Sequence, residues 1–267
     1  MEWRKIKLTF SYQGTAYFGL QRQKNGPSIQ EEIEKALRKI LEHEAALVSS
    51  GRTDSGVHAR MQVAHFRTNH PIPANRLPYA MNTILPDDIV ILEACDVPQN
   101  FHARYHVTEK TYRYRLLNQL FPDPFLRDWA YHVRAPLDLD KMRRAAAYLI
   151  GTHDFTSFCS VRTKVVDKVR TLHEIRIEET QRDTGIPGQG KDIWLTFRGN
   201  GFLYNMVRMM TGTLLEVGRG KVPAEHVKWL LEIKNGDIAK INAPPHGLYL
   251  WEVRYDEPSS LSTVPGV

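Results

Sequence analysis

The sequence has little cysteine and no long apolar run, and each shortage argues against a class of protein. Only two cysteines, Cys95 and Cys159, occur in 267 residues, which favours a reduced, intracellular protein over a disulfide-stapled one. No CxxC or HExxH spacing is present and no three histidines stand at ligand spacing, so we expect no metal site. No apolar segment has the length of a membrane span or the character of a signal peptide, so we expect a cytoplasmic protein without a membrane partner.

Signatures of nucleotide cofactors are missing as well. The glycine-containing segment 184–190 lacks the Lys-Ser/Thr ending of a phosphate-binding P-loop and falls between two strand-like segments, where a hairpin is expected. Charge is only moderately biased: 36 Lys and Arg against 30 Asp and Glu give a net charge of +6. This excess is compatible with a polyanionic partner such as nucleic acid but does not by itself require one.

The first hundred residues have the pattern of one α+β unit. Alternating apolar residues predict strands at 6–12, 47–49, 62–67 and 88–94. Helices are expected at 29–41, with Ser28 and Glu31 forming a capping box, and at 73–84. The resulting order is a split β-α-β arrangement of the ferredoxin-like kind.

A second α+β unit is expected from about residue 101. Its strands are predicted at 111–116, 129–133, 166–178, 193–198 and 248–254, and its helices at 139–150, 200–217 and 224–233. We therefore expect an N-terminal subdomain over 1–100 and a C-terminal subdomain over 101–267. Two ferredoxin-like-type α+β subdomains, with mixed or antiparallel sheets side by side, would form a central basic cleft suited to a ligand.

The densest cluster of polar residues is the run Gly51-Arg52-Thr53-Asp54-Ser55-Gly56-Val57-His58 between two predicted strands. The plain interpretation is a polar hairpin tip, since Asp and Gly are common turn residues. The functional interpretation is a site on a loop held by two anchored strands. Arg52 and Asp54 lie two residues apart, so that one can engage a phosphate while the other faces a sugar or a base.

The second half offers two further candidates for chemistry. Tyr112 and Tyr114 alternate with arginines on a predicted strand, a pattern typical of core aromatics but also of a base-stacking site beside phosphate-binding arginines. Arg208 falls within a helix whose other residues form an apolar face. Most such arginines are solvated, but one that points inward can pair with a carboxylate such as Asp54 and keep it ionised.

Gly51–His58 resembles the active-site signature of the TruA-type tRNA pseudouridine synthases. Other segments that look familial follow in the family's order: YFGLQRQ at 17–23, FHAR at 101–104, KTYRY at 110–114, DFTSF at 154–158, NMVR at 205–208 and APPHGLYL at 243–250. Leu20, Ser55 and Cys159 depart from the residues common in the family at those positions. Collinear agreement over nearly the whole chain is far more specific than any one motif.

The resemblance implies a reaction and a set of residue roles. The reaction is isomerisation of uridine to pseudouridine at positions 38, 39 and 40 in the anticodon stem-loop of tRNA, without a cofactor. Asp54 is implied as the essential carboxylate, which attacks C1′, adds to the base or assists a glycal route. Tyr112 is expected to stack on the target base and Arg208 to pair with Asp54. Arg52 is expected to fill the space left by the flipped base.

Further RNA contacts are expected at Arg22, Arg60 and Leu248, and family likeness implies a homodimer. Two alternatives stay open at this stage. One is a non-catalytic RNA-binding protein on the same scaffold, which would have no use for Asp54. The other is a different base-modifying or glycosidic enzyme, and a two-carboxylate glycosidase would need a second acidic group near Asp54.

Overall fold

A computed structural model describes residues 2–161, 163, 165–182, 190–236, 238 and 241–256. The chain divides into two compact units, one formed by Met1–Glu109 with Leu250–Val267 and the other by Lys110–Tyr249. The sequence placed the boundary at residue 100 and assigned the whole C-terminus to the second subdomain. In the structure the first unit continues to Glu109 and resumes at Leu250, so it also includes most of the last strand. The predicted α+β class is confirmed, since each unit combines helices with a sheet.

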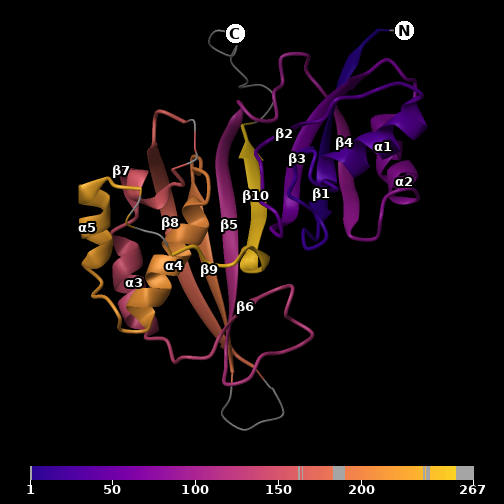
Figure 1. Ribbon diagram of the computed structural model, residues 1–267. Coiled ribbons are helices and arrows are strands. Elements are labelled where there is room, and N and C mark those ends of the chain that lie inside the picture. The colour runs from indigo at the N-terminus through magenta and orange to yellow at the C-terminus, as the bar shows by residue number, and fades with distance from the viewer. Residues whose placement is uncertain are drawn as a thin grey trace. The chain divides into compact units, whose positions relative to one another are not determined.

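Unit 1 is built on three long antiparallel strands. β1 (Arg4–Tyr12) pairs with β3 (His58–Thr68) on one side and with β4 (Ile89–Val97) on the other. The short β2 (Val48–Ser49) also pairs with β3, and the part of β10 (Leu248–Tyr255) that belongs to this unit adds to the order β4-β1-β3-β10. The helices are α1 (Ile29–Leu41) and α2 (Leu77–Asn82), the latter preceded by the 3-10 turn η1 (Ala74–Arg76). Figure 1 shows both helices on the same side of these strands.

The register of β1 and β3 sorts their side chains onto two faces. Ile6 lies opposite Phe66 and Leu8 opposite Ala64, and all four are buried in the core. The intervening residues point to the other face, where Lys7 lies opposite His65. On the buried face the register also places Phe10 opposite Gln62, a fully buried polar side chain. Because of this alternation, Gln62 is buried close to the loop that leads into β3.

Two local sequence signals determine the helices of unit 1. The Ser28 hydroxyl accepts a hydrogen bond from the Glu31 amide at 3.3 Å, so the predicted N-cap of α1 is confirmed. The helix predicted at 73–84 is confirmed in part, because α2 spans Leu77–Asn82 but the residues before it form a 3-10 turn. Pro78 explains the break, since its nitrogen has no hydrogen to donate and it fits only the first turn of a helix.

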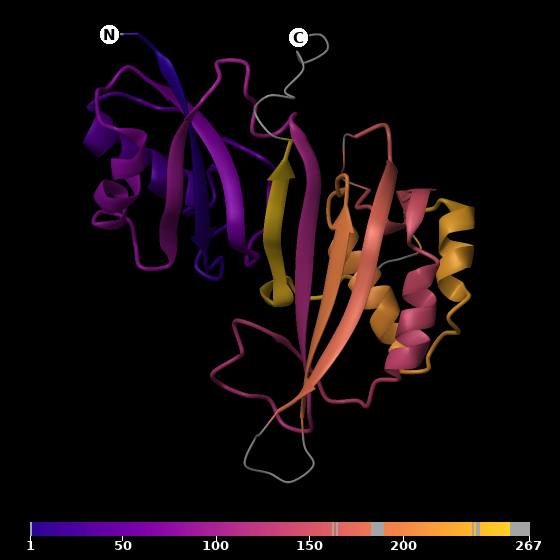
Figure 2. The same ribbon diagram turned by 180° about the vertical axis from the view of Figure 1, so that it is seen from behind.

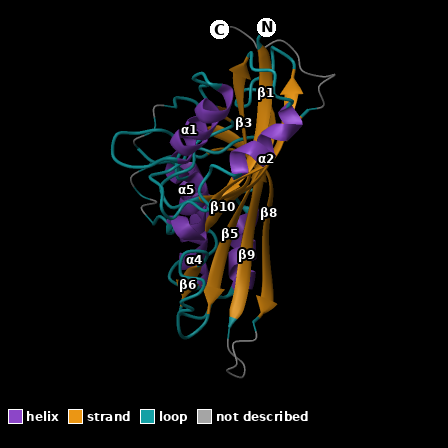
Figure 3. Ribbon diagram, turned by 90° about the vertical axis from the view of Figure 1, so that its right-hand side faces the viewer, coloured by secondary structure: helices purple, strands orange, loops and turns teal. Residues whose placement is uncertain are grey.

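Unit 2 has the strand order β5-β9-β8-β7, in which neighbouring strands are antiparallel. The strands are β5 (Val107–Asn118), β6 (Tyr131–Val133), β7 (Gly151–Asp154), β8 (Val169–Gln181) and β9 (Lys191–Gly199), with β6 parallel to β5. The helices are α3 (Leu139–Ala147), α4 (Met206–Gly218) and α5 (His226–Ile233). The 3-10 turns are η2 (Thr156–Phe158) and η3 (Pro245–Gly247). Figure 2 shows the three helices on one side of β8 and β9, and Figure 3 shows β5, β9 and β8 running side by side.

Two helices of unit 2 are shorter than predicted. The helix expected at 200–217 begins only at Met206, because Asn200 is tied to Thr171 of β8 through both its backbone and its side chain. The helix expected at 139–150 ends at Ala147, and the short strand β7, which was not predicted, follows. The segment 184–189 of the predicted hairpin and the tail from 257 lie outside the described residues.

No helix in the described part of the chain combines the length and apolar character that crossing a membrane requires.

Candidate active site

Asp54 lies on the loop that joins β2 to β3. Its side chain is half-buried, whereas Arg52 and Ser55 are exposed. The Val57 amide donates to the Asp54 carbonyl at 3.1 Å, which closes a tight turn directly after the aspartate. Gly56 takes a φ of +76° in that turn, a left-handed conformation that glycine adopts without a steric penalty. The position of Asp54 is therefore set by a hydrogen-bonded turn rather than by an open loop.

The segment 13–20 packs directly on this loop. The Leu20 amide donates to the Thr53 carbonyl at 3.2 Å, and the Ser55 hydroxyl donates to the Tyr17 carbonyl at 3.1 Å. The approach depends on Gly19, whose φ is +95° and where an added Cβ would lie 2.8 Å from the Thr53 carbonyl oxygen. The residues on both sides of Asp54 are thus bonded to one neighbouring segment.

A second contact fixes the beginning of β3. The Gly14 amide donates to Nδ1 of the buried His58 at 3.1 Å. A Cβ on Gly14 would fall 2.0 Å from the Val57 carbonyl oxygen, so a side chain cannot be accommodated at this position without a shift of backbone. Segment 13–20 therefore contacts the loop at Thr53, at Ser55 and at its exit into β3.

Replacing Gly19 by alanine is expected to destabilise unit 1 by about 1–3 kcal/mol, because the positive φ is strained for alanine and the Cβ clashes with backbone. Gly220→Ala is the matched control, since Gly220 has a φ of +71° but nothing within 4 Å of an added Cβ. Thermal unfolding midpoints of the two variants separate the clash from the strain. An equal fall in both midpoints would contradict the close approach seen at Gly19.

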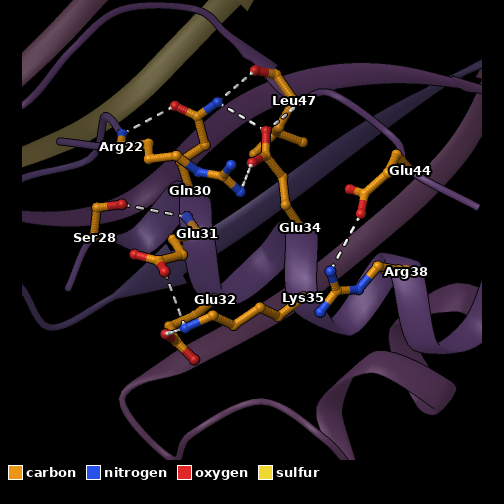
Figure 4. A network of polar contacts seen from close by, with 10 residues as sticks. All are labelled: Arg22, Ser28, Gln30, Glu31, Glu32, Glu34, Lys35, Arg38, Glu44 and Leu47. Atoms are coloured by element: carbon orange, nitrogen blue, oxygen red, sulfur yellow. Dashed lines mark hydrogen bonds and ion pairs between the residues drawn. The ribbon is translucent and has the colours of Figure 1, made fainter. Parts of the chain in front are cut away.

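Arg22 is anchored to the buried carboxylate of Glu34 on α1 (Figure 4). Its Nη2 lies 2.7 Å from Oε2 of Glu34, while the rest of the arginine side chain stays largely exposed. The other Glu34 oxygen accepts from the Leu47 amide at 2.9 Å and from Gln30 Nε2 at 2.8 Å. Glu34 thereby holds together α1, the Arg22 segment and the chain just before β2.

Arg60 follows the loop on β3 and is exposed. Its guanidinium carbon lies 5.6 Å from the centre of the Trp251 ring, a cation–π distance that restricts the side chain without burying it. Together with Arg52 and Arg22 it gives unit 1 three exposed arginines on or beside the segments that frame Asp54. Exposed guanidinium groups of this kind suit contacts with phosphates.

Tyr112 lies on β5 in unit 2, on the same face of the strand as Tyr114. It is 9% exposed and meets Phe202 edge-on, with ring centres 5.0 Å apart. Tyr114, two residues on, is fully buried and donates its hydroxyl to the Pro244 carbonyl at 2.7 Å. Burial raises the pKa of Tyr114 well above its ordinary value, so this hydroxyl stays protonated. Tyr114 is the core aromatic that the alternation predicts, and Tyr112 keeps a small accessible area.

Arg208 stands in the first turn of α4 and is half-buried rather than solvated. Its Nε donates to the Ala243 carbonyl at 2.8 Å and its Nη1 to Oδ1 of Asn205 at 3.1 Å. The Ala243 amide in turn donates to the Arg208 carbonyl at 3.1 Å. These bonds hold the guanidinium in one orientation, and Asn205, in the left-handed conformation with a φ of 63°, starts the helix there.

Leu248, the other residue predicted to contact RNA, is buried at the beginning of β10, directly after η3. Asp54, Arg52, Arg22 and Arg60 thus belong to unit 1, and Tyr112, Arg208 and Leu248 to unit 2. No group of His, Cys, Asp and Glu suited to holding a metal ion occurs among the residues the structure describes.

The sequence interpretation missed the polar residues beneath the loop. Tyr12, Ser50 and Gln62 are buried, and they contact Thr53 or the residues that lead into the loop. The signal was the alternation of β1 and β3, which places Tyr12 and Gln62 on the buried face. A buried glutamine in a strand needs hydrogen-bond partners.

Comparison with known proteins places the chain among close relatives. A family model described as tRNA pseudouridine synthase matches residues 8–106 and 145–256. The tRNA pseudouridine synthase A of Bacillus pumilus and that of Bacillus subtilis are each 48% identical over 254 residues, which is 94% of this chain and 99% of each relative. That of Thermoanaerobacter pseudethanolicus is 43% identical over 252 residues, or 94% of this chain and 100% of the relative. The family model includes Asp54 and Arg208 but not Tyr112.

Proposed function

The chain belongs to the tRNA pseudouridine synthase family, and from this membership we propose that it acts on uridines 38, 39 and 40 of the tRNA anticodon stem-loop with Asp54 as its essential carboxylate. The protein is an enzyme that isomerises uridine to pseudouridine in tRNA.

The reaction is balanced without a redox partner. The bond between N1 and C1′ breaks, the uracil turns, and C5 bonds to C1′. The hydrogen on C5 leaves as a proton and N1 regains one, so the product is an isomer of the substrate. Because the reacting atoms are inaccessible inside a base stack, the target nucleotide must be turned out of it before reaction.

The observation that carries the proposal is the way Asp54 is held. Its half-buried carboxylate follows Thr53, whose carbonyl is bonded to Leu20, and precedes Ser55, whose hydroxyl is bonded to Tyr17. A carboxylate that acts as nucleophile or base gains most when its geometry is fixed before the substrate arrives. A plain hairpin tip would need none of these bonds.

The other residues receive roles that support Asp54. Tyr112 stacks on the target base, and Arg52 fills the space that the turned-out base leaves. Arg208 supplies the positive charge that keeps Asp54 ionised. Exposed Arg22 and Arg60 bind tRNA phosphates, and Leu248 contributes an apolar contact. The enzyme acts in the cytoplasm as a homodimer, a state that sedimentation of the purified protein with and without tRNA measures.

Replacing Arg208 by methionine is expected to move the acid limb of the pH–rate profile to higher pH. On the proposed pairing with Asp54, loss of the Arg208 charge disfavours the ionised carboxylate, so activity that requires this ionised form is lost earlier as the pH falls. Arg219→Met is the control, since Arg219 lies at the other end of α4 and pairs with Glu216. An unchanged acid limb in Arg208→Met would contradict the proposed role.

The substrate proposal is tested with tRNA transcripts labelled with tritium at C5 of uridine. Purified protein is expected to release tritium from a transcript with uridine at 38, 39 and 40, and none when those three positions carry cytidine. Release from both transcripts alike would contradict the anticodon-arm assignment while leaving the activity itself in place.

A further inference from the structure

We propose that an inner anchor, formed by the buried side chains of Tyr12, Ser50, Thr53 and Gln62, positions Asp54 for reaction. The inference rests on the proposed role of Asp54 and goes beyond it, because none of these four side chains is assigned to the reaction itself. Tyr12 and Gln62 belong to β1 and β3, Ser50 and Thr53 to the segment that joins β2 to β3, and all four side chains are buried.

The first contact of the inner anchor joins the residue before Asp54 to the sheet. The Tyr12 and Thr53 hydroxyls are 2.6 Å apart, and both side chains are buried. Burial raises the pKa of Tyr12 to about 12, so the phenol stays protonated at neutral pH and the pair is a neutral hydrogen bond. The Thr53 hydroxyl is bonded to Tyr12 and the Thr53 carbonyl to the Leu20 amide. The backbone at Thr53 therefore cannot rotate without breaking one of these hydrogen bonds.

The second contact holds the entry to the loop. Gln62 is fully buried, and its Oε1 accepts from the Ser50 hydroxyl at 2.6 Å and from the Val63 amide at 3.0 Å. Its Nε2 donates to the Gly51 carbonyl at 3.1 Å. The two contacts together hold residues 50, 51 and 53, so both act on the same short stretch of chain before Asp54. Satisfied buried networks of this kind favour one arrangement of the chain.

The inner anchor and segment 13–20 hold the loop from different sides. Through Tyr12 and Gln62, the anchor holds the chain at residues 50, 51 and 53. Segment 13–20 holds it at residues 53, 55 and 58. Asp54 lies between Thr53, whose hydroxyl is bonded to Tyr12 of the anchor, and Ser55, whose hydroxyl is bonded to Tyr17 of segment 13–20. A shift of about 1 Å at a reacting group can cost about a hundredfold in rate, so loss of one hydroxyl here acts on turnover more than on binding.

The test removes single hydroxyls from the full-length protein. Thr53→Val and Tyr12→Phe each keep the shape of the side chain and lose its part in the bond. We expect kcat for pseudouridine formation to fall by about tenfold or more while KM for tRNA stays within about twofold. Thr53→Ser retains a hydroxyl and is expected to recover most of the rate. If Thr53→Val does not fold, Tyr12→Phe carries the same test.

The matched control is Thr68→Val at the far end of β3. Thr68 is fully buried, and its hydroxyl lies 2.9 Å from Nε2 of His43 and 3.0 Å from the His70 amide. This variant loses bonds of the same kind in the same unit but is expected to keep its kcat within about twofold. Comparable falls in unfolding midpoint for Thr53→Val and Thr68→Val, with a fall in kcat only for Thr53→Val, would support a positioning role.

The proposed positioning role of the inner anchor is contradicted if Thr53→Val and Tyr12→Phe keep full kcat while their unfolding midpoints fall as in Thr68→Val. In that case the four side chains only stabilise unit 1. Asp54→Ala, measured in parallel, keeps the two proposals apart. An inactive Asp54→Ala with fully active anchor variants sinks only the inner anchor, whereas an active Asp54→Ala sinks the proposed role of Asp54.

Discussion

Replacing Asp54 by alanine or asparagine is expected to abolish pseudouridine formation, with a loss of about a thousandfold or more, because no other carboxylate occurs in the loop that carries it. Asparagine keeps the shape of the side chain but carries no negative charge and cannot serve as nucleophile or base. Affinity for tRNA is expected to stay within a few-fold, since contacts with the phosphate backbone usually dominate the affinity of proteins for nucleic acids. Tritium release under single-turnover conditions measures the first expectation, and filter binding measures the second.

Asp87→Asn is the matched control, because it also removes one negative charge from unit 1. Asp87 lies in an exposed turn of unit 1 and is expected to be replaced without loss of rate. An asparagine at position 54, which Ser55 follows, can slowly deamidate and restore the aspartate. Alanine cannot, so the alanine variant excludes activity regained in this way. Turnover by Asp54→Ala close to that of Asp87→Asn would contradict the assignment.

We propose that the Tyr112 hydroxyl takes part in proton transfer, so Tyr112→Phe, which keeps the ring but loses the hydroxyl, is expected to lower the rate by about a hundredfold. Tyr112→Ala is expected to lose more. It removes the stacking surface and the edge-on contact with Phe202, and it opens a cavity that costs about 3–5 kcal/mol of stability. Rates at saturating tRNA, with unfolding midpoints measured beside them, separate the two effects.

Tyr148→Phe removes a hydroxyl from a half-buried tyrosine elsewhere in unit 2 and serves as the control. A Tyr112→Phe variant that reacts as fast as this control would restrict Tyr112 to stacking. Full activity of Tyr112→Ala would remove Tyr112 from the site altogether.

Alternation and capping were enough to predict much of unit 1. The Ile6–Tyr12 pattern predicted β1, and Ser28 predicted the beginning of α1, because these signals are local and the structure satisfies them locally. The loop around Asp54 was found for the same reason, since its glycines and polar residues interrupt two apolar strands. Chemistry at Asp54 could not be read from the loop alone, and the collinear family segments supplied it.

What could not be predicted depends on pairing between distant residues. Tyr12 meets Thr53 only because β1 and β3 pair in one register, with a bulge between Phe10 and Tyr12. The beginning of α4 likewise depends on the bonds of Asn200 to Thr171 and on the left-handed Asn205, neither of which leaves a periodic signal. The ion pair of Arg22 with Glu34, at 2.7 Å, likewise depends on the fold and has no periodic signal in the sequence.

The pseudouridine content of tRNA from cells that lack this protein tests the central claim most directly. The same cells carrying either the wild-type protein or Asp54→Ala complete the comparison. We predict that pseudouridine disappears at positions 38, 39 and 40 alone, and that the wild-type protein restores it while Asp54→Ala does not. Pseudouridine that persists at those positions without the protein, or that returns with Asp54→Ala, would contradict the account.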